Sequence, residues 1–221
     1  MADTYRILLA DDHVLVAEGI QKLLEPEFQL IGIVADGRAL IAEAAKLQPD
    51  IVVVDISLPL LNGLDASAQL KRHQPDLKII VLTMHSEQNF VTQAFRVGAS
   101  GYVLKQSVGS ELVQAIREVV KGRTFVSPMV AQSLVDQAVN KSSTETSVDA
   151  DRAFAPTLSS RQREVLQLVA EGKATKEIAS ILNVSVKTVE FHKTRIMKEL
   201  RLRTAAELTK YAIAAGLTSI H

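Results

Sequence analysis

The stretch Ile51-Val-Val-Val-Asp-Ile-Ser-Leu-Pro-Leu-Leu-Asn-Gly63 decides the fold of the first half of the chain. Its first four residues are β-branched and do not alternate with polar residues, which is typical of a strand buried on both faces of a parallel sheet. Asp55 follows this strand directly. Because ligands bind at the carboxyl ends of the strands in open parallel sheets, Asp55 is a candidate for the site of chemistry. Taken alone, the same residue fits the cap of the following helix equally well.

Short apolar runs alternate with helical patterns five times between residues 5 and 121. The helical patterns have one apolar side each, as Leu112, Ile116 and Val119 show at positions i, i+4 and i+7. This alternation predicts an α/β doubly wound domain with a five-stranded parallel sheet. The expected strands are residues 5–10, 29–34, 51–54, 78–82 and 101–103.

The length of 221 residues favours two domains over one. Residues 140–151 contain one large apolar residue, too few to offset the entropy lost when the segment is ordered. We therefore expect one domain at residues 1–125, a helical extension and flexible linker at residues 126–156, and a second domain at residues 157–221.

The second domain shows four helical segments and no strand pattern, at residues 159–170, 175–182, 185–200 and 204–215. Ser159 with Gln162, and Thr204 with Glu207, have the spacing of capping boxes. Residues 156–221 contain 11 basic and 6 acidic residues, whereas residues 1–125 contain 12 and 15. A helix, a short turn and a helix inside a basic segment predict a small all-α helix-turn-helix domain that binds DNA.

Composition excludes several classes of protein and site. The chain has no cysteine, so it has no disulfide framework, thiolate metal site or cysteine nucleophile. It shows no signal peptide at its start and no apolar span of 18 residues, which favours a cytoplasmic protein without membrane contact. The segment around Gly172 and Lys173 is not a phosphate-binding loop, because Gln167 stands where the first glycine is required.

Polar residues end four of the expected strands: Asp11 with Asp12, Asp55, Thr83 and Lys105. Parallel strands bring these ends to one edge of the sheet, where clustered carboxylates repel one another unless a cation neutralises them. A hard divalent ion with oxygen ligands, Mg²⁺, suits this role and leaves Asp55 able to attack a phosphoryl group. The hydroxyl of Thr83 and the ammonium of Lys105 would then stabilise the oxygens of that group.

The segments Leu8-Leu-Ala-Asp-Asp-His13, Asp55-Ile-Ser-Leu-Pro59, Leu82-Thr83 and Gly98-Ala-Ser-Gly-Tyr-Val-Leu-Lys105 resemble the receiver domain of bacterial response regulators. The resemblance spans residues 5–121 and implies a flavodoxin-like fold that accepts a phosphoryl group from a sensor histidine kinase. It implies these roles: phosphoacceptor Asp55; Mg²⁺ ligands Asp11, Asp12 and Asp55 with the carbonyl of Ser57; switch and phosphoryl-stabilising residues Thr83, Tyr102 and Lys105.

Some neighbouring residues depart from the receiver pattern or stay outside the site. Gln106 stands where many receivers have proline, so the resemblance does not define the geometry of the loop after Lys105. Met84, directly after Thr83, is bulkier than the small residue often found at that position. His13 is interpreted as a surface residue rather than a ligand, because no second histidine has metal-site spacing. For Tyr102, the switch role rests on the resemblance, and plain packing is the alternative.

Residues 158–217 resemble the helix-turn-helix of the NarL/FixJ, or LuxR-type, regulators through Leu158-Ser-Ser-Arg-Gln-Arg-Glu-Val-Leu166, Glu177-Ile-Ala179 and Val186-Lys-Thr-Val-Glu-Phe-His192. In the third helix, inward-facing Val189, Ile196 and Leu200 leave an aromatic residue, Phe191, on the outer side, which favours contact with a partner. The resemblance implies DNA contacts and dimerisation through the fourth helix. The candidate DNA-binding residues are Lys176, Lys187, Thr188, Glu190, Phe191, Thr194, Arg195 and Lys198, and the candidate dimerisation residues are Leu208, Ala212 and Ala215.

These observations together predict a DNA-binding transcription regulator that is phosphorylated by a histidine kinase and binds promoter DNA as a homodimer on activation. It is not expected to be an enzyme beyond catalysing its own phosphoryl transfer and dephosphorylation. Three alternatives belong to other classes. A phosphatase with an aspartyl nucleophile needs an acid where Ser57 stands. A receiver-like domain that is never phosphorylated, in a constitutive DNA binder, has no use for the complete set of Asp12, Asp55, Thr83 and Lys105. A flavin-binding domain of the same topology has no need of these carboxylates.

Overall fold

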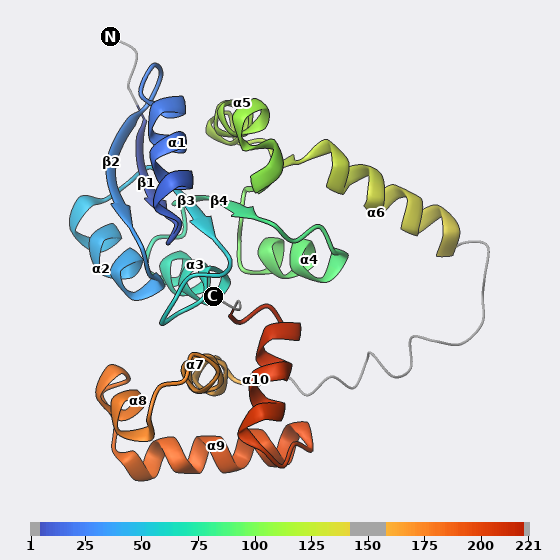
Figure 1. The fold of residues 1–221 in the computed structure, drawn as a ribbon. Helices are drawn as coiled ribbons and strands as arrows, with labels where there is room; N and C mark the ends of the chain where they lie inside the picture. The colour runs from blue at the N-terminus through green and yellow to red at the C-terminus, as the bar shows by residue number, and fades with distance from the viewer. Residues whose placement is uncertain (1–4, 142–157, 219–221) are drawn as a thin grey trace. The chain divides into compact units, whose positions relative to one another are not determined.

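The computed structural model describes residues 5–141 and 158–218. The chain divides into two compact units, Met1–Ser143 and Thr144–His221. The first unit combines a sheet with surrounding helices, and the second is built from helices (Figure 1).

The sheet of the first unit is parallel throughout and has the strand order β2-β1-β3-β4-β5-β6. The predicted doubly wound fold is confirmed, with a sixth strand in addition to the five that the sequence predicts. The extra strand has only two residues and pairs with the edge of β5, too short a segment to show a strand pattern in the sequence. The strands are β1 Arg6–Ala10, β2 Gln29–Val34, β3 Ile51–Asp55, β4 Lys78–Thr83, β5 Gly101–Leu104 and β6 Phe125–Val126.

Five helices cover the two faces of the sheet, with α1 and α5 on one face and α2, α3 and α4 on the other (Figure 1). Successive strand residues alternate between the faces: Ile7 and Leu9 pack with α1 and α5, whereas Leu8 and Ala10 pack on the opposite side. Both faces are therefore apolar, as the unalternating pattern of β3 predicts. The helices are α1 Val14–Leu24, α2 Gly37–Leu47, α3 Gly63–His73, α4 Gln88–Arg96 and α5 Val108–Val120.

The loop after β3 returns closely to its own strand, and Gly63 makes this possible. A Cβ atom at Gly63 would lie 1.9 Å from the main-chain oxygen of Asp55, so no other residue fits without a shift of the backbone. The Gly63 N–H donates to the carbonyl of Ile56 at 2.8 Å. Asn62 caps α3 by accepting the N–H of Asp65 at 2.9 Å. The start of α3 thus fixes the main chain at Asp55.

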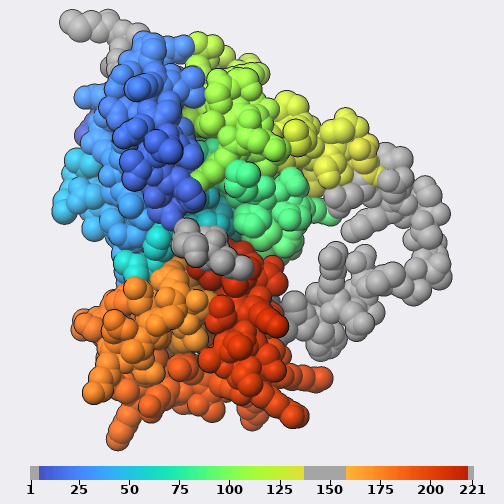
Figure 2. All heavy atoms as spheres, viewed as in Figure 1, coloured from blue at the N-terminus to red at the C-terminus, as the bar shows by residue number. Residues whose placement is uncertain are grey.

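The chain continues from β6 into α6, Pro128–Lys141, which begins the expected helical extension. Its first turn joins the core through Val130, which is fully buried, and Leu134 packs against the same cluster. The next residue, Val135, is 56% exposed, and Figure 2 shows the yellow first part of α6 projecting from the body of the unit. The expected linker at residues 142–156 lies outside the described residues.

The second unit contains the four predicted helices, α7 Ser160–Ala170, α8 Thr175–Ile181, α9 Val186–Leu200 and α10 Ala205–Ala214. Both predicted capping boxes are present, Ser159 with Gln162 at α7 and Thr204 with Glu207 at α10. The core combines α7, whose residues 164–168 are all buried, with Val189 and Ile196 of α9. Nowhere in residues 5–141 or 158–218 is a helix both long and apolar enough to span a bilayer.

Candidate functional site

The four polar strand ends meet at one edge of the sheet, as predicted. Lys105, directly after β5, places its Nζ atom 2.8 Å from Asp11 Oδ2 and 2.9 Å from Asp55 Oδ2. Asp11 and Asp55 follow or end the central strands β1 and β3, and they are only 2% and 3% exposed. Thr83 ends β4, between the strands that hold Asp55 and Lys105, and is fully buried. Two buried carboxylates therefore share one ammonium group.

The electrostatics of this trio follow from its burial. Burial raises the pKa of Asp55, and the charge and hydrogen bond of Lys105 oppose part of that rise, while Asp11 adds to it. For Lys105 the balance is different: burial lowers its pKa, but Asp55 and Asp11 together outweigh burial and raise it. Lys105 thus stays protonated, and the pocket keeps a fixed positive charge beside the carboxylate of Asp55.

Asp12 and His13 lie beside Asp11 and Asp55 and are more exposed than those two carboxylates. One potential ligand atom from each of Asp11, Asp12, His13 and Asp55 lies within 4.8 Å of the others. The side chain of His13 is 52% exposed, and its Nδ1 atom lies 2.9 Å from Asp12 Oδ1. Three convergent carboxylates with one neighbouring cation are a donor set that fits a hard divalent ion such as Mg²⁺. The residues present therefore fit the predicted metal.

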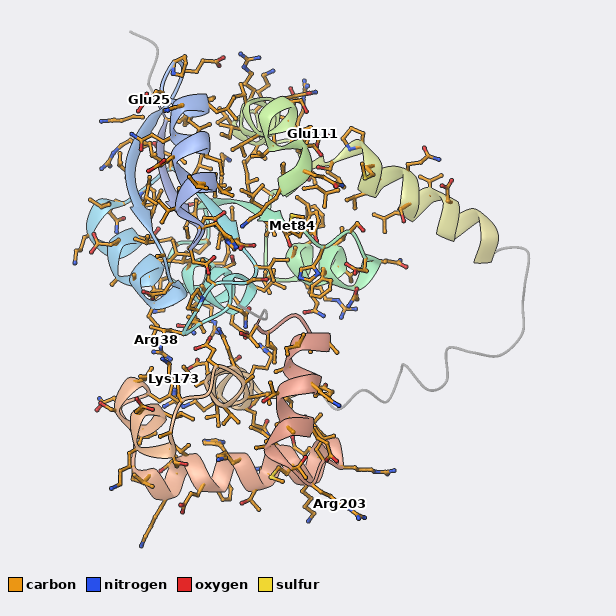
Figure 3. All side chains as sticks on the ribbon, in the orientation of Figure 1. Glu25, Arg38, Met84, Glu111, Lys173 and Arg203 are labelled. Atoms are coloured by element: carbon orange, nitrogen blue, oxygen red, sulfur yellow. The ribbon has the colours of Figure 1, made fainter. Side chains whose placement is uncertain are left out.

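Ser57 faces the same site through its main chain. Its N–H donates a hydrogen bond to the carboxylate of Asp55, which favours the charged form of that group. The predicted contribution of the Ser57 carbonyl to a metal stays a prediction. Of the two departures from the receiver pattern, Met84 is 69% exposed (Figure 3), and Gln106 Nε2 donates to Met129 Sδ of α6 at 3.1 Å.

Thr83 and Tyr102 are linked through a residue that the sequence did not single out, His85. The Tyr102 hydroxyl donates to the His85 carbonyl at 2.8 Å, and the Thr83 hydroxyl accepts the His85 N–H at 3.1 Å. The His85 ring stacks on Phe90 of α4, with ring centroids 4.1 Å apart. Burial, followed by the charge of Glu87, raises the pKa of Tyr102, so its hydroxyl remains a donor. Main-chain groups of His85 make these bonds, and no side-chain pattern could have revealed them.

The outer side of α9 carries the residues that the sequence proposes for DNA. Phe191 is 59% exposed, and Lys187 and Glu190 on the same helix are exposed, as is Lys176 of α8. Thr188 is half-buried. Its hydroxyl lies 2.8 Å from the hydroxyl of the capping residue Ser185, so it forms a hydrogen bond within the first turn of α9. A shallow open hollow runs along α9 and is lined by Phe191, Thr194, Arg195, Lys198 and Glu199.

Two of the three residues predicted to form the dimer surface lie in the core of their own unit. Leu208 is 1% exposed and Ala212 is fully buried, and α10 packs against α7 of the same unit. These two residues belong to the core of their own domain, so their assignment to an intermolecular surface is wrong. The apolar spacing was the signature of a core face, which sequence periodicity cannot distinguish from an interface. Ala215, the third residue of the stripe, is half-buried.

Comparisons with known proteins agree with both halves of this arrangement. Residues 7–117 match the response regulator receiver domain family, and residues 156–212 match the luxR family of bacterial regulatory proteins. The chain is 38% identical to the oxygen regulatory protein NreC of Staphylococcus carnosus over 217 residues, which cover 96% of this chain and 98% of the relative.

Two solved structures are also similar. A two-component response regulator of the LuxR family from Aurantimonas sp. is 38% identical, with a TM-score of 0.60 over 62% of this chain and 99% of the other. RcsB from Salmonella enterica serovar Typhimurium, bound to a promoter in the presence of the phosphomimetic BeF3-, is 31% identical, with a TM-score of 0.59 over 98% and 100% of the two chains. The chain therefore belongs to the NarL/FixJ family of bacterial two-component response regulators, which join a receiver domain to a LuxR-type helix-turn-helix.

Proposed function

We propose that Asp55 accepts a phosphoryl group from a sensor histidine kinase in the cytoplasm, and that the helix-turn-helix unit then binds promoter DNA as a homodimer. The observation that carries this proposal is the shared ammonium of Lys105, which lies within 2.9 Å of both Asp11 and Asp55. A buried carboxylate that keeps a fixed cation beside it can accept an anionic group that it would otherwise repel.

The pocket residues divide the chemistry among them. A carboxylate oxygen of Asp55 attacks the phosphorus, the bond from phosphorus to the donor histidine nitrogen breaks, and an acyl phosphate forms on Asp55. The Thr83 hydroxyl at the end of β4 and the ammonium of Lys105 directly after β5 would bind oxygens of the transferred group. Asp11 and Asp12, with the carboxylate of Asp55 and the carbonyl of Ser57, would hold Mg²⁺, which supplies further positive charge to the phosphoryl oxygens when bound.

The acceptor of the phosphoryl group is a residue of the chain itself, so we infer that the chain catalyses only its own phosphoryl transfer and dephosphorylation. For the output unit, the exposed residues Lys187, Glu190 and Phe191 of α9 support contact with the major groove. A single short helix contacts few base pairs, which supports a dimer on DNA. Because Leu208 and Ala212 are buried, we assign the dimer contact to the exposed side of α10, where Lys210 and Ala214 lie.

Intact-mass measurement tests the phosphoacceptor directly. Incubation with acetyl phosphate and Mg²⁺ should add one phosphoryl group to the full chain, and neither Asp55→Asn nor the wild type in excess chelator should gain it. The matched control is Asp65→Asn, which changes a buried carboxylate at the start of α3 and should leave the gain intact. A phosphoryl group that persists in Asp55→Asn contradicts the assignment.

A further inference from the structure

Ser127 joins three elements of the receiver unit at a single buried point between β6 and α6. It is 0% exposed. Its N–H donates to the carbonyl of Tyr102 at 2.9 Å, which extends the pairing of β6 with β5. Its carbonyl accepts the N–H groups of Val130 and Ala131 at 2.9 and 3.0 Å, so it also starts α6. Both main-chain groups of Ser127 are thus used for structure.

The hydroxyl of Ser127 makes two more bonds, one of them with the residue directly before Lys105. It accepts the N–H of Leu104 at 3.0 Å. It donates to a carboxylate oxygen of Glu111 in the first turn of α5, where Glu111 lies close to the chain that enters α6 (Figure 3). The acidic acceptor fixes the direction of the hydroxyl proton and leaves the lone pairs of the oxygen for Leu104. Leu104 is the last residue of β5, directly before Lys105.

A weaker contact, between exposed side chains, lies on the other side of Lys105. Gln106, the residue after it, donates from Nε2 to Met129 Sδ at 3.1 Å. Val130, one residue further along α6, is fully buried in the same cluster as Tyr102 and Leu104. Residues 104 and 106 are therefore both attached to the start of α6, and Lys105 is bracketed between them.

We propose that Ser127 is a positioning residue for Lys105, acting through the Leu104 N–H, and that the start of α6 is therefore part of the support of the phosphoryl pocket. This inference rests on the proposed role of Asp55 as phosphoacceptor. Removal of the hydroxyl leaves the Leu104 N–H buried without an acceptor, so the end of β5 must shift or admit water. A shift of the main chain at residue 104 moves the ammonium that is shared by Asp11 and Asp55, and a small displacement of a charged group is costly to catalysis.

The first test measures the rate at which the full chain takes up phosphoryl groups from acetyl phosphate in saturating Mg²⁺. Ser127→Ala should slow uptake by roughly fivefold, the equivalent of one buried hydrogen bond in the barrier. Ser127→Thr, which keeps the hydroxyl, should recover most of the wild-type rate. The control is Thr209→Ala, whose hydroxyl donates to the Ala205 carbonyl at 3.1 Å within α10 of the second unit and whose loss should leave the rate unchanged.

A double-mutant cycle separates positioning from general damage to the fold. If Ser127 acts through Lys105, Ser127→Ala should add no further slowing in a Lys105→Ala background. An equal fold-loss in both backgrounds would mean that Ser127 acts independently of Lys105, and the inference would be overturned.

Amide hydrogen exchange gives a readout that does not depend on phosphorylation. Without any phosphoryl donor, the Leu104 amide should exchange roughly tenfold or more faster in Ser127→Ala, while amides of β1 and β3 keep their protection. If the wild type takes up no phosphoryl group but Leu104 exchange still rises, the proposed function fails and the hydrogen bond stands. If wild-type uptake is normal and Ser127→Ala changes neither the rate nor the Leu104 exchange, the inference on Ser127 fails alone.

Discussion

The hydroxyl of Tyr102 donates a 2.8 Å hydrogen bond to the main-chain carbonyl of His85, while the N–H of the same histidine donates to Thr83 Oγ1 at 3.1 Å. Thr83 ends β4 beside Asp55, and Tyr102 lies within β5, so a main-chain unit two residues after β4 joins the pocket to the neighbouring strand. A shift of Thr83 toward a new phosphoryl group would therefore move the acceptor of Tyr102 as well. This connection gives the predicted switch a physical path.

Thr83→Ala tests that path. The variant keeps Asp55 and Lys105, so it should still take up a phosphoryl group, but it should lose most of the phosphorylation-dependent gain in DNA affinity. Thr83→Ser retains the hydroxyl and serves as the control. Titration of promoter duplex with phosphorylated and unphosphorylated protein decides the matter: an undiminished gain in Thr83→Ala would reject the switch role.

Tyr102→Phe removes the hydroxyl and leaves the ring in the core. Because the His85 carbonyl loses its side-chain donor, the free energy of unfolding of the receiver unit should fall by about 1 kcal/mol. Urea denaturation measures the change, and Tyr5→Phe is a control at a half-buried tyrosine outside this network. A stability equal to that of the wild type would show that the bond to His85 contributes nothing in solution.

Much of the receiver unit could be predicted because its signals are local. The four β-branched residues before Asp55 require burial on both faces, and parallel strands then bring Asp11, Thr83 and Lys105 to the same edge. Gly63 and Asn62 reinforce this arrangement, because a glycine is needed against Asp55 and an asparagine fits the helix cap. The pocket thus follows from pattern and topology together.

The features that could not be predicted depend on tertiary context. Strand β6 is two residues long, and it exists because the N–H groups of Phe125 and Ser127 donate to the carbonyls of Ser100, directly before β5, and of Tyr102 within β5. Leu208 and Ala212 have a spacing that suits a core or an interface equally, and only packing against α7 distinguishes the two. The bonds to His85 use main-chain atoms, which are present in every residue and carry no sequence signal.

Lys105→Ala should destabilise the receiver unit in the absence of Mg²⁺. It leaves two buried carboxylates without their cation, a change that typically costs about 3–5 kcal/mol of unfolding free energy. Burial raises the pKa of Asp55 and Lys105 opposes that rise, so the pKa goes higher when Lys105 is removed. The folded state then holds a proton that the unfolded state releases, and stability falls as the pH rises through the raised pKa.

The loss in Lys105→Ala should therefore be larger near about pH 8 than near about pH 5, and added Mg²⁺ should reduce it by neutralising the carboxylates. Thermal or urea unfolding over this pH range, with and without Mg²⁺, measures both effects. Lys46→Ala is the control, because Lys46 forms an exposed pair with Glu43 on α2 and contributes little. A loss that is independent of pH would argue against unpaired carboxylates as its cause.

The outer side of α9 should separate two kinds of DNA contact. Lys187 is exposed at the start of the helix and suits a phosphate, whereas exposed Glu190 can accept a hydrogen bond from a cytosine amino group. Lys187→Ala should weaken binding to every sequence and lower the slope of the salt dependence by roughly one unit. Glu190→Ala should instead relax the preference at one base pair, by roughly 1–3 kcal/mol.

Both variants fail in different ways because phosphate contacts hold the protein in register without reading sequence, while base contacts distinguish one duplex from another. Titration against a specific and a scrambled duplex at several salt concentrations separates the two effects. Lys193→Ala is a matched control for charge, since Lys193 lies on the same helix but is half-buried. Equal losses on the specific and scrambled duplexes for Glu190→Ala would remove Glu190 from the base-reading role, and a salt slope unchanged in Lys187→Ala would remove Lys187 from the phosphate-binding role.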